Sequence, residues 1–346
     1  MSRETIKADL CVIGAGAGGL STAAGAAMLG RKVVLFEAGE MGGDCLNTGC
    51  VPSKAILTAA HAAHHVRKAR RLGVTAGEPE IDFDQVMAHV RGAIKTIEPN
   101  DSQERFEGLG VRVVREFARF TGADTVESDC VSVRARRIVI AAGSRAAVPP
   151  IPGLSEAPYL TNETIWKLDR LPDHLMILGG GPIGSELSQA FARLGAKVTV
   201  VEAGRMLSRF EPEHAALVKR ALEASGVEVI EGDAVNAVET TPAGPALILE
   251  GGRRIEGSHL LVAAGRTPNV EHLDLEAAGV EADKRGIVCD DKLRTANKRV
   301  YAVGDIAGKG ALTHLAGWHG SVVIRNLYFG LPTKQSASAI PAAVYT

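Results

Sequence analysis

The stretch DLCVIGAGAGGLSTAAGAAMLGRKVVLFE, residues 9–37, decides the fold. It begins with a short apolar run, Asp9–Ile13, passes through the glycine-rich GAGAGG, and continues in small residues to about Leu29. A second apolar run, Lys32–Phe36, ends in Glu37. This order predicts a strand, a tight turn, a helix and a second strand, which together make one βαβ unit.

Residues 10–30 carry no charge and are long enough to cross a bilayer. Their Gly and Ala content makes them too weakly apolar for lipid, and no basic segment with a cleavage site precedes them. We therefore expect a buried strand and helix, no membrane partner and a cytoplasmic location.

The turn of this unit has the pattern Gly14-x-Gly16-x-x-Gly19, and Glu37 follows 23 residues after Gly14. One glycine makes the tight turn, one lets the backbone approach a pyrophosphate, and one allows close packing of helix on strand. The helix N-terminus offers N–H groups to phosphates, and Glu37 would accept hydrogen bonds from a ribose diol. The stretch therefore predicts a dinucleotide site.

The same pattern returns later, with a strand, a helix and a strand predicted at Leu175–Leu178, Ile183–Leu194 and Lys197–Val201. Its turn reads Gly179-x-Gly181-x-x-Gly184, and Glu202 again follows 23 residues after the first glycine. Such a duplication at domain scale predicts two dinucleotides. Glu202 favours NAD, because a carboxylate repels a 2′-phosphate, while the nearby Arg205 keeps NADP open.

Two cysteines, Cys45 and Cys50, lie in MGGDCLNTGCVPSKA, residues 41–55. A zinc site needs about four ligands, and the face formed by His61, His64 and His65 brings no second cysteine pair. A passive structural disulfide is rare in a reducing cytoplasm. A redox dithiol at a helix start, marked by Pro52, fits better, although spacing alone leaves the alternatives open.

Three further motifs stand at Ile138–Ala146 (IVIAAGSRA), Ala263–Asn269 (AAGRTPN) and Val300–Gly308 (VYAVGDIAG). With the cysteine segment and both glycine turns, they make the chain resemble the flavoprotein disulfide reductases, in the branch that holds glutathione reductase, dihydrolipoamide dehydrogenase and mercuric reductase. The resemblance implies an α/β fold of two Rossmann-like, three-layer ββα-type domains, with the second inserted in the first. The implied parts are an FAD-binding domain at 1–150 and 269–332, an NAD(P)-binding domain at 151–268, and the start of a truncated dimerisation domain at 333–346.

The resemblance also implies roles for single residues. Cys50 would lie nearest the flavin, Cys45 would meet the substrate, and Lys54 would pair with Glu186 beside the flavin ring. The implied FAD-side residues are Gly14, Gly16, Gly18, Gly19, Glu37, Ala38, Gly43, Asp44, Cys45, Lys54, Ala118, Ala142, Gly143, Ser144, Gly304, Asp305, Ala311, Leu312, Thr313 and His314. The implied nicotinamide-side residues are Gly179, Gly181, Pro182, Ile183, Gly184, Glu186, Glu202, Val235 and Gly265.

The implied activity is NAD(P)H-disulfide oxidoreduction with FAD and NAD, acting on a small-molecule disulfide or dithiol in a homodimer. Dihydrolipoamide dehydrogenase-like activity leads, and mercuric reductase-like or glutathione-reductase-type activity is the alternative. A redox sensor that never turns over a substrate is a further alternative, which the intact dithiol argues against. We expect no metal, and a net charge of −1 without a Lys/Arg cluster in the sequence excludes nucleic acid as a partner.

Two features depart from the family pattern. No His-Pro dipeptide occurs, so the family's catalytic histidine is missing, and the final SAIPAAVYT is similar to the first strand of the interface domain. These features predict a fragment with weak turnover. Asp44 stands where a threonine is usual, and we expect its side chain to point to solvent or to recruit a cation or water, while backbone N–H groups keep the phosphate contact. The remaining cysteines, Cys11, Cys130 and Cys289, are expected to be small buried hydrophobic residues.

Overall fold

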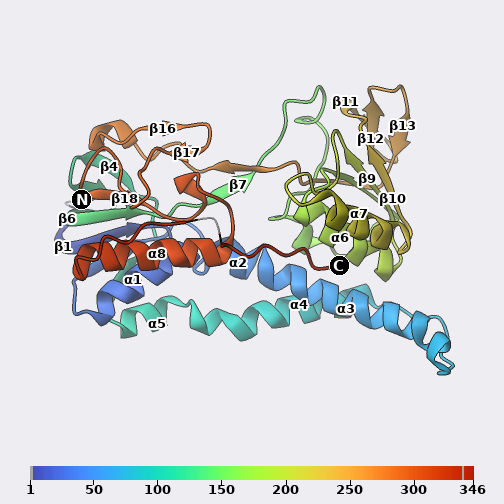
Figure 1. The fold of residues 1–346 in the computed structure, drawn as a ribbon, viewed down its shortest axis with the longest axis horizontal. Helices are drawn as coiled ribbons and strands as arrows, with labels where there is room; N and C mark the ends of the chain where they lie inside the picture. The colour runs from blue at the N-terminus through green and yellow to red at the C-terminus, as the bar shows by residue number, and fades with distance from the viewer. Residues whose placement is uncertain (1–2, 337–338) are drawn as a thin grey trace. The chain divides into compact units, whose positions relative to one another are not determined.

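The computed structural model describes residues 3–336 and 339–346, which form two compact units (Figure 1). Unit 1 comprises Met1–Asn47, Lys95–Arg145 and Thr267–Pro341. Unit 2 comprises Thr48–Ile94, Ala146–Arg266 and Ala342–Thr346. The chain therefore leaves each unit and returns to it, as an insertion of one fold in another requires.

Unit 1 is built on a seven-stranded sheet in the order β3-β2-β1-β6-β5-β4, with β18 also paired to β6. The strands are β1 (Glu4–Ile13), β2 (Val33–Phe36), β3 (Val111–Val114), β4 (Arg119–Gly122), β5 (Thr125–Glu127), β6 (Val131–Ile140) and β18 (Val300–Ala302). The β1, β2, β3, β6 and β18 strands are parallel, whereas β4 and β5 add an antiparallel hairpin. The carboxyl ends of the parallel strands therefore share one edge, where a ligand of an open α/β sheet binds.

The helices of unit 1 are α1 (Ala17–Met28), α2 (Gly43–Asn47), α5 (Gln103–Gly108) and α8 (Thr313–Tyr328). Helices α1 and α8 lie side by side (Figure 1). Gly25 permits this approach, since a Cβ there would lie 3.1 Å from Ile324. Short elements complete the unit: η2 (Glu98–Asn100), η4 (Leu275–Ala278), β16 (Ala282–Asp283), β17 (Gly286–Ile287) and η5 (Asp305–Ala307).

Unit 2 has three layers around a parallel sheet in the order β10-β9-β8-β14. Its sheet strands are β8 (His174–Leu178), β9 (Lys197–Glu202), β10 (Val227–Glu231) and β14 (His259–Val262). Alternate residues of β8 face opposite sides: Leu175 and Ile177 pack in one core with Phe191 of α6, and Met176 and Leu178 pack in another core with the strands β11–β13. One face of the sheet is thus covered by helices and the other by a β-meander.

The outer elements of unit 2 are α3 (Cys50–Lys68), η1 (Ala69–Leu72), η3 (Ile165–Lys167), α6 (Pro182–Leu194), α7 (Pro212–Glu223), β11 (Val235–Thr241), β12 (Gly244–Leu249) and β13 (Arg254–Glu256). Helix α4 (Phe83–Ile97) belongs mostly to this unit, and its Phe83 ring lies 6.3 Å from the Phe191 ring of α6. The crossover strands β7 (Ser144–Ala146) and β15 (Arg266–Pro268) pair with each other.

The prediction of two Rossmann-like dinucleotide-binding folds is confirmed. Between residues 83 and 108 the chain forms α4, η2 and α5 rather than one helix, because Pro99 cannot continue an α-helix. The strand-like run at the C-terminus has no strand in residues 339–346, since no neighbouring strand pairs with it there.

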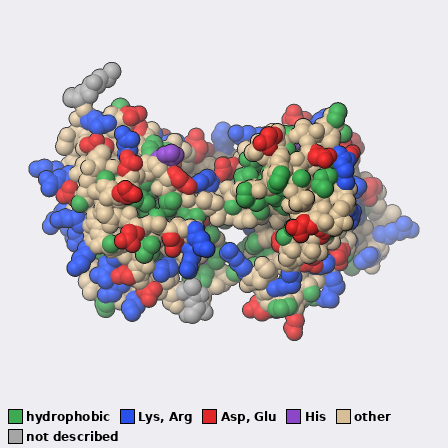
Figure 2. Space-filling model, turned by 90° about the horizontal axis from the view of Figure 1, so that it is seen from above, with side chains coloured by type: hydrophobic (Ala, Val, Ile, Leu, Met, Phe, Trp, Pro, Cys, Tyr) green, Lys and Arg blue, Asp and Glu red, His purple; other side chains and the backbone are tan. Residues whose placement is uncertain are grey.

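Residues 10–30, the uncharged segment, form the last part of β1, from Leu10 to Ile13, and all of α1. In the described part of the chain, no helix has both the length and the apolarity needed to cross a bilayer. On the face shown in Figure 2, basic and acidic side chains are interspersed, in keeping with the formal net charge of −1.

Candidate functional site

The glycine turn of unit 1 leads from β1 into α1 in a conformation that only this sequence pattern permits. Gly14 has φ +104°, and a Cβ there would lie 2.4 Å from the carbonyl oxygen of Ala141. A Cβ at Gly19 would lie 1.8 Å from the Gly14 oxygen, so the helix touches the strand at this point. Around Gly16, in contrast, a Cβ would meet nothing within 4 Å. The turn is therefore closed on the sheet side and open at the helix N-terminus.

Glu37 ties the end of β2 to this turn. Its Oε2 accepts a hydrogen bond from the Ala15 N–H at 2.6 Å, and its Oε1 accepts one from the Gly39 N–H at 2.6 Å. The carboxylate is thus held beside the turn at the carboxyl edge of the sheet. Each carboxylate oxygen has a second lone pair, so Glu37 retains the capacity to accept hydrogen bonds from a hydroxyl group.

The glycine turn of unit 2 repeats this geometry. A Cβ at Gly179 would lie 2.5 Å from the Ala263 oxygen, a Cβ at Gly184 would lie 2.0 Å from the Gly179 oxygen, and Gly181 has nothing within 4 Å. Glu202 accepts hydrogen bonds from the N–H groups of Gly180 at 2.7 Å and Gly204 at 3.0 Å. The repeated sequence pattern therefore makes the same kinds of backbone contact in both units.

Both turns fit a pyrophosphate-containing group. Helices α1 and α6 have 12 and 13 residues, and neither N-cap, Gly16 or Gly181, supplies a side-chain hydrogen bond to the helix. The first N–H groups of each helix therefore remain available to an anion, which the helix dipole also favours. The open space at these two glycines leaves room for the anion to approach the backbone.

Other predicted FAD-side residues lie around the same edge of unit 1. Ser144 Oγ donates to Asp305 Oδ2 at 2.6 Å, which links the start of β7 to the start of η5. A Cβ at Gly43 would lie 2.8 Å from the Gly16 Cα, and a Cβ at Gly18 would lie 3.0 Å from the Val303 side chain. Asp44 is exposed, as expected.

The remaining members of the predicted set differ in burial. Ala118 is buried, Ala38 is exposed, and Ala142 and Gly143 are half-buried near the end of β6. Ala311, Leu312, Thr313 and His314 lead into α8, and His314 Nε2 lies 2.8 Å from the Pro341 oxygen. In unit 2, Pro182 and Ile183 begin α6, and Gly265 accepts a hydrogen bond from the Ala147 N–H. Val235 is 8% exposed and belongs to the core that Met176 and Leu178 of β8 form with the strands β11–β13.

The predicted redox cysteines lie on two successive helices. Cys45 lies in the short helix α2 of unit 1, and Cys50 is the first residue of α3 in unit 2. Both are partly exposed. Asn47 holds the backbone around Cys45, because its Nδ2 donates to the carbonyl oxygens of Met41 and Gly43 at 3.0 Å each.

Lys54 and Glu186 form the ion pair that the resemblance predicts. Lys54 Nζ lies 2.7 Å from Glu186 Oε2, and the Glu186 side chain is 7% exposed. Lys54 is four residues after Cys50 in α3, so both side chains project from the same face of that helix. Helices α3 and α6 pack against each other within unit 2, which brings the two charges together.

The contacts of three residues, Tyr345, His319 and Asn269, were not predicted from the sequence. The Tyr345 N–H donates to Glu186 Oε1 at 3.1 Å, and Lys54 Nζ lies 4.5 Å from the Tyr345 ring centroid. The buried His319 accepts a hydrogen bond from the Gly304 N–H at 3.1 Å. Asn269 Nδ2 donates to the Ala142 oxygen at 2.8 Å. Asn269 lay inside a recognised motif, whereas neither His319 nor Tyr345 stood out by residue type or spacing.

Cys11 and Cys289 are buried and half-buried, and burial raises the pKa of both thiols, that of Cys289 to about 11. The prediction that Cys130 is buried is wrong. Cys130 is exposed at the end of a turn, and its hydrogen bond with Glu116 raises the pKa of its thiol. Among residues 3–336 and 339–346, no group of three or more His, Cys, Asp or Glu side chains could hold a metal ion.

Burial lowers the pKa of His61 and His64, that of His64 to about 4, and the nearby Arg193 adds to the effect. The two imidazoles are therefore neutral at pH 7. They lie on the α3 face that the sequence predicted.

The geometry defines a class: a protein with two dinucleotide-binding folds, two cysteines in the segment that leads from the first unit into the second, and a Lys–Glu ion pair one helical turn after the second cysteine. The family described as pyridine nucleotide-disulphide oxidoreductase matches residues 8–320, and the chain belongs to this family. It is therefore a flavoprotein oxidoreductase of the disulfide-reductase type. Proteins of this family use FAD and a nicotinamide nucleotide, and the two glycine turns are sites of the kind that these groups require.

Similar curated proteins fall into two activities. A mercuric reductase of Streptomyces lividans is 36% identical over 98% of this chain and 73% of its own length. A dihydrolipoyl dehydrogenase of Thermus scotoductus is 37% identical over 92% of this chain and 70% of its own length. A mercuric reductase of Bacillus cereus is 32% identical over 98% of this chain, but over only 54% of its own length.

A solved structure supports the fold. The HOCl-induced flavoprotein disulfide reductase RclA from Escherichia coli superimposes with a TM-score of 0.84 at 26% identity, over 95% of this chain and 72% of that one. The chain thus spans between about half and three quarters of the length of these relatives.

Proposed function

We propose that this protein transfers electrons between NAD(H) and a small dithiol or disulfide of the lipoamide type, through FAD and the Cys45–Cys50 pair. The observation that carries the proposal is the Lys54–Glu186 ion pair on the face of α3 that also bears Cys50. A structural scaffold does not need a largely buried carboxylate balanced by a lysine one turn from a cysteine. In the reducing direction, NADH, a proton and a disulfide give NAD⁺ and a dithiol.

The roles of the chain's own groups follow from their positions. FAD, when bound, accepts a hydride from the nicotinamide and passes two electrons to a disulfide. Cys50, at the start of α3, is assigned the inner position, and Cys45 is assigned the exchange with substrate through a mixed disulfide. Lys54 places a positive charge beside the site, and Glu186 fixes where that charge lies.

Contacts around Glu202 support NAD over NADP. The Glu202 carboxylate is held by two backbone N–H groups at the end of β9, where a 2′-phosphate would meet its charge. Arg205, the nearby residue that could balance a phosphate, donates instead to the carbonyl oxygens of Ser208 at 3.2 Å and Phe210 at 3.0 Å. Its guanidinium is therefore engaged with its own loop.

A half-reaction tests the proposal most directly, since it does not need the histidine base that the sequence lacks. FAD-loaded protein is reduced anaerobically with one equivalent of NADH, and its thiols are then counted with a disulfide reagent under denaturing conditions. We expect two additional thiols per FAD in the parent protein and none in Cys45→Ser or Cys50→Ser. The matched control Cys130→Ser should still gain two. Loss of NADH without any gain of thiols in the parent protein would refute the proposal.

Mercuric reduction is the second candidate, because relatives with that name match as much of the chain as those named dihydrolipoyl dehydrogenase. NADH oxidation measured side by side with lipoamide, glutathione disulfide and Hg(II) distinguishes the two. Faster oxidation with lipoamide supports the first candidate, and faster oxidation with Hg(II) supports the second.

A further inference from the structure

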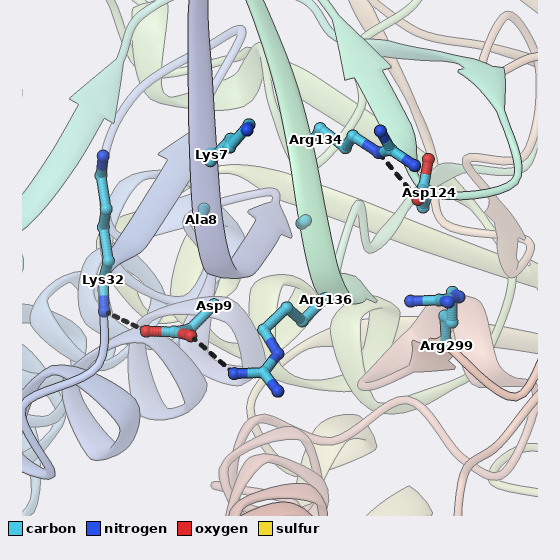
Figure 3. Close-up of a pocket in the computed structure, with 9 residues that line it drawn as sticks. Lys7, Ala8, Asp9, Lys32, Asp124, Arg134, Arg136 and Arg299 are labelled. Carbon is cyan, nitrogen blue, oxygen red and sulfur yellow. Dashed lines mark hydrogen bonds and ion pairs between the residues drawn. The ribbon is translucent and has the colours of Figure 1, made fainter.

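A cationic depression lies in unit 1, away from the glycine turn of that unit (Figure 3). Its volume is about 450 Å³. It is lined by Lys7, Ala8 and Asp9 of β1, Lys32 before β2, Asp124 of the β4–β5 turn, Arg134, Ala135 and Arg136 of β6, and Arg299 before β18. Five cationic side chains therefore face two carboxylates in one small space.

The two carboxylates are already engaged. Asp124 Oδ2 accepts a hydrogen bond from Arg134 Nε at 3.1 Å. Asp9 lies 3.7 Å from Arg136 through one oxygen and accepts the Lys32 backbone N–H at 3.0 Å through the other. Among the described residues, no carboxylate lies within 4.0 Å of the side-chain nitrogens of Lys7, Lys32 or Arg299. Three positive charges therefore remain unbalanced, although the protein as a whole has a formal net charge of −1.

The walls of the depression are fixed by backbone hydrogen bonds. The Lys32 oxygen accepts the Asp9 N–H at 2.9 Å, and the Arg299 oxygen accepts the Ile138 N–H at 2.9 Å. Asn297 Nδ2 donates to the Ala123 oxygen at 2.9 Å, which joins the segment before β18 to the turn that bears Asp124. The buried Ala8 and Ala135 pair across β1 and β6 and leave space between the longer side chains. The charges are thus held on ordered backbone.

The depression is separate from the dinucleotide site. Lys32 and Arg299 immediately precede β2 and β18, so they lie at the amino ends of parallel strands, whereas Gly14 follows the carboxyl end of β1. Six residues of extended β1 separate Ala8 from Gly14, which corresponds to about 20 Å. An ordinary solvated surface would intersperse its charges, as the face in Figure 2 does. In the depression, by contrast, the strand order of the sheet brings together cationic side chains that are as far apart in the sequence as Lys7 and Arg299.

We propose that this depression binds an oligophosphate anion, such as inorganic tripolyphosphate or the triphosphate of a nucleotide. A triphosphate carries three to four negative charges. The three unbalanced cations can neutralise most of this charge, and the two arginines paired with Asp9 and Asp124 can donate further hydrogen bonds to phosphate oxygens. The volume lies within the range of small-molecule sites, and arginine and lysine are the side chains that bind phosphate oxygens. Because the site is shallow and charged, binding is salt-dependent.

Isothermal titration of FAD-loaded protein with tripolyphosphate, in the presence of saturating NAD⁺, tests the proposal. We expect one saturable site at 50 mM NaCl and at least fivefold weaker binding at 200 mM NaCl. The double variant Lys7→Glu/Arg299→Glu should bind at least tenfold more weakly. The control Lys284→Glu/Lys334→Glu makes the same charge change at exposed residues of unit 1 that lie outside the depression, and its affinity should change less than twofold.

Equal weakening in both double variants would show general charge attraction and overturn the proposal, as would the absence of saturable binding at 50 mM NaCl. FAD content and the unfolding temperature are measured for each variant. If the charge reversal lowers either, Lys7→Gln/Arg299→Gln replaces it and should still weaken binding at least threefold. Titration with ATP then distinguishes a nucleotide, which should bind more tightly than tripolyphosphate, from the phosphate chain alone.

Discussion

Lys54 Nζ and Glu186 Oε2 lie 2.7 Å apart, and the two residues are 132 positions apart in the sequence. Glu186 comes from α6, directly after the second glycine turn, and Lys54 comes from α3, directly after the cysteine pair. The pair therefore joins the helix that starts at the glycine turn of unit 2 to the helix that starts at Cys50.

A double-mutant cycle at this pair measures how much the ion pair contributes to the free energy of unfolding. Lys54→Met leaves the largely buried Glu186 carboxylate without its cation, and we expect the free energy of unfolding to fall by about 1–3 kcal/mol. Lys54→Met/Glu186→Leu should recover part of this loss, which gives a coupling energy above about 1 kcal/mol. Urea unfolding of the four proteins provides the values.

The control cycle uses Lys219 and Glu231, an ion pair of unit 2 whose side chains are 32% and 22% exposed. Its coupling energy should be below about 1 kcal/mol, because both the carboxylate and the ammonium group remain in contact with solvent. Equal coupling in both cycles would contradict a special role for burial at Glu186.

Alanine at two glycines of the first turn should have opposite consequences. Gly16→Ala adds a Cβ into open space at an ordinary φ of −78°, so the protein should fold with nearly unchanged unfolding temperature but lose more than half of its bound FAD. Gly19→Ala places the Cβ 1.8 Å from the Gly14 oxygen and should prevent soluble expression.

The matched variant for Gly16→Ala is Gly181→Ala, which has the same open surroundings in unit 2. It should retain FAD and weaken nicotinamide binding about tenfold. Absorbance at the flavin maximum gives the FAD content, and titration with NADH gives the affinity. Normal FAD content in Gly16→Ala would show that this turn does not bind the pyrophosphate of FAD.

The sequence predicted what is governed by local pattern. Gly19 and Glu37 stand at fixed spacings from Gly14 because they contact the turn of their own βαβ unit, whose strand, turn and helix are adjacent in the chain. The depression with Lys7, Lys32 and Arg299 could not be predicted, because strand order alone brings these residues together. The prediction for Cys130 was wrong for a different reason: it depended on residue type alone, whereas the position of Cys130 in the connection between β5 and β6 leaves it exposed.

The proposed preference for NAD depends on the charge of Glu202 as well as on its position. Glu202→Gln retains an oxygen that can accept the Gly180 N–H but removes the charge. We expect the ratio of kcat/KM for NADPH to that for NADH to rise about tenfold, measured as FAD reduction under anaerobic conditions. Glu213→Gln, at an exposed position of α7, should leave the ratio unchanged. An unchanged ratio in Glu202→Gln would show that other groups select the nucleotide.

Because of His319, we expect the folded state to lose stability as the pH falls below neutral. Burial, followed by the charge of Lys309, lowers the pKa of this histidine to about 4 in the folded protein. Its Nδ1 accepts the Gly304 N–H, so the neutral ring is the form that fits the turn before Asp305. A histidine with its pKa lowered from about 6.5 stabilises the folded state above pH 6.5 and loses that contribution as the pH falls toward 4. The loss should be about 2 kcal/mol by pH 5.

His319→Gln tests this expectation, because the glutamine oxygen can accept the Gly304 N–H but does not titrate. Urea unfolding between pH 8 and pH 5 should show a smaller loss of stability in His319→Gln than in the parent protein, by about 2 kcal/mol at pH 5. Other histidines with a lowered pKa, such as His64 and His174, are present in both proteins and cancel in the comparison. His89→Gln, on the exposed face of α4, should follow the parent curve. Parallel curves for the parent and His319→Gln would mean that the ring at 319 accepts a proton without leaving the turn.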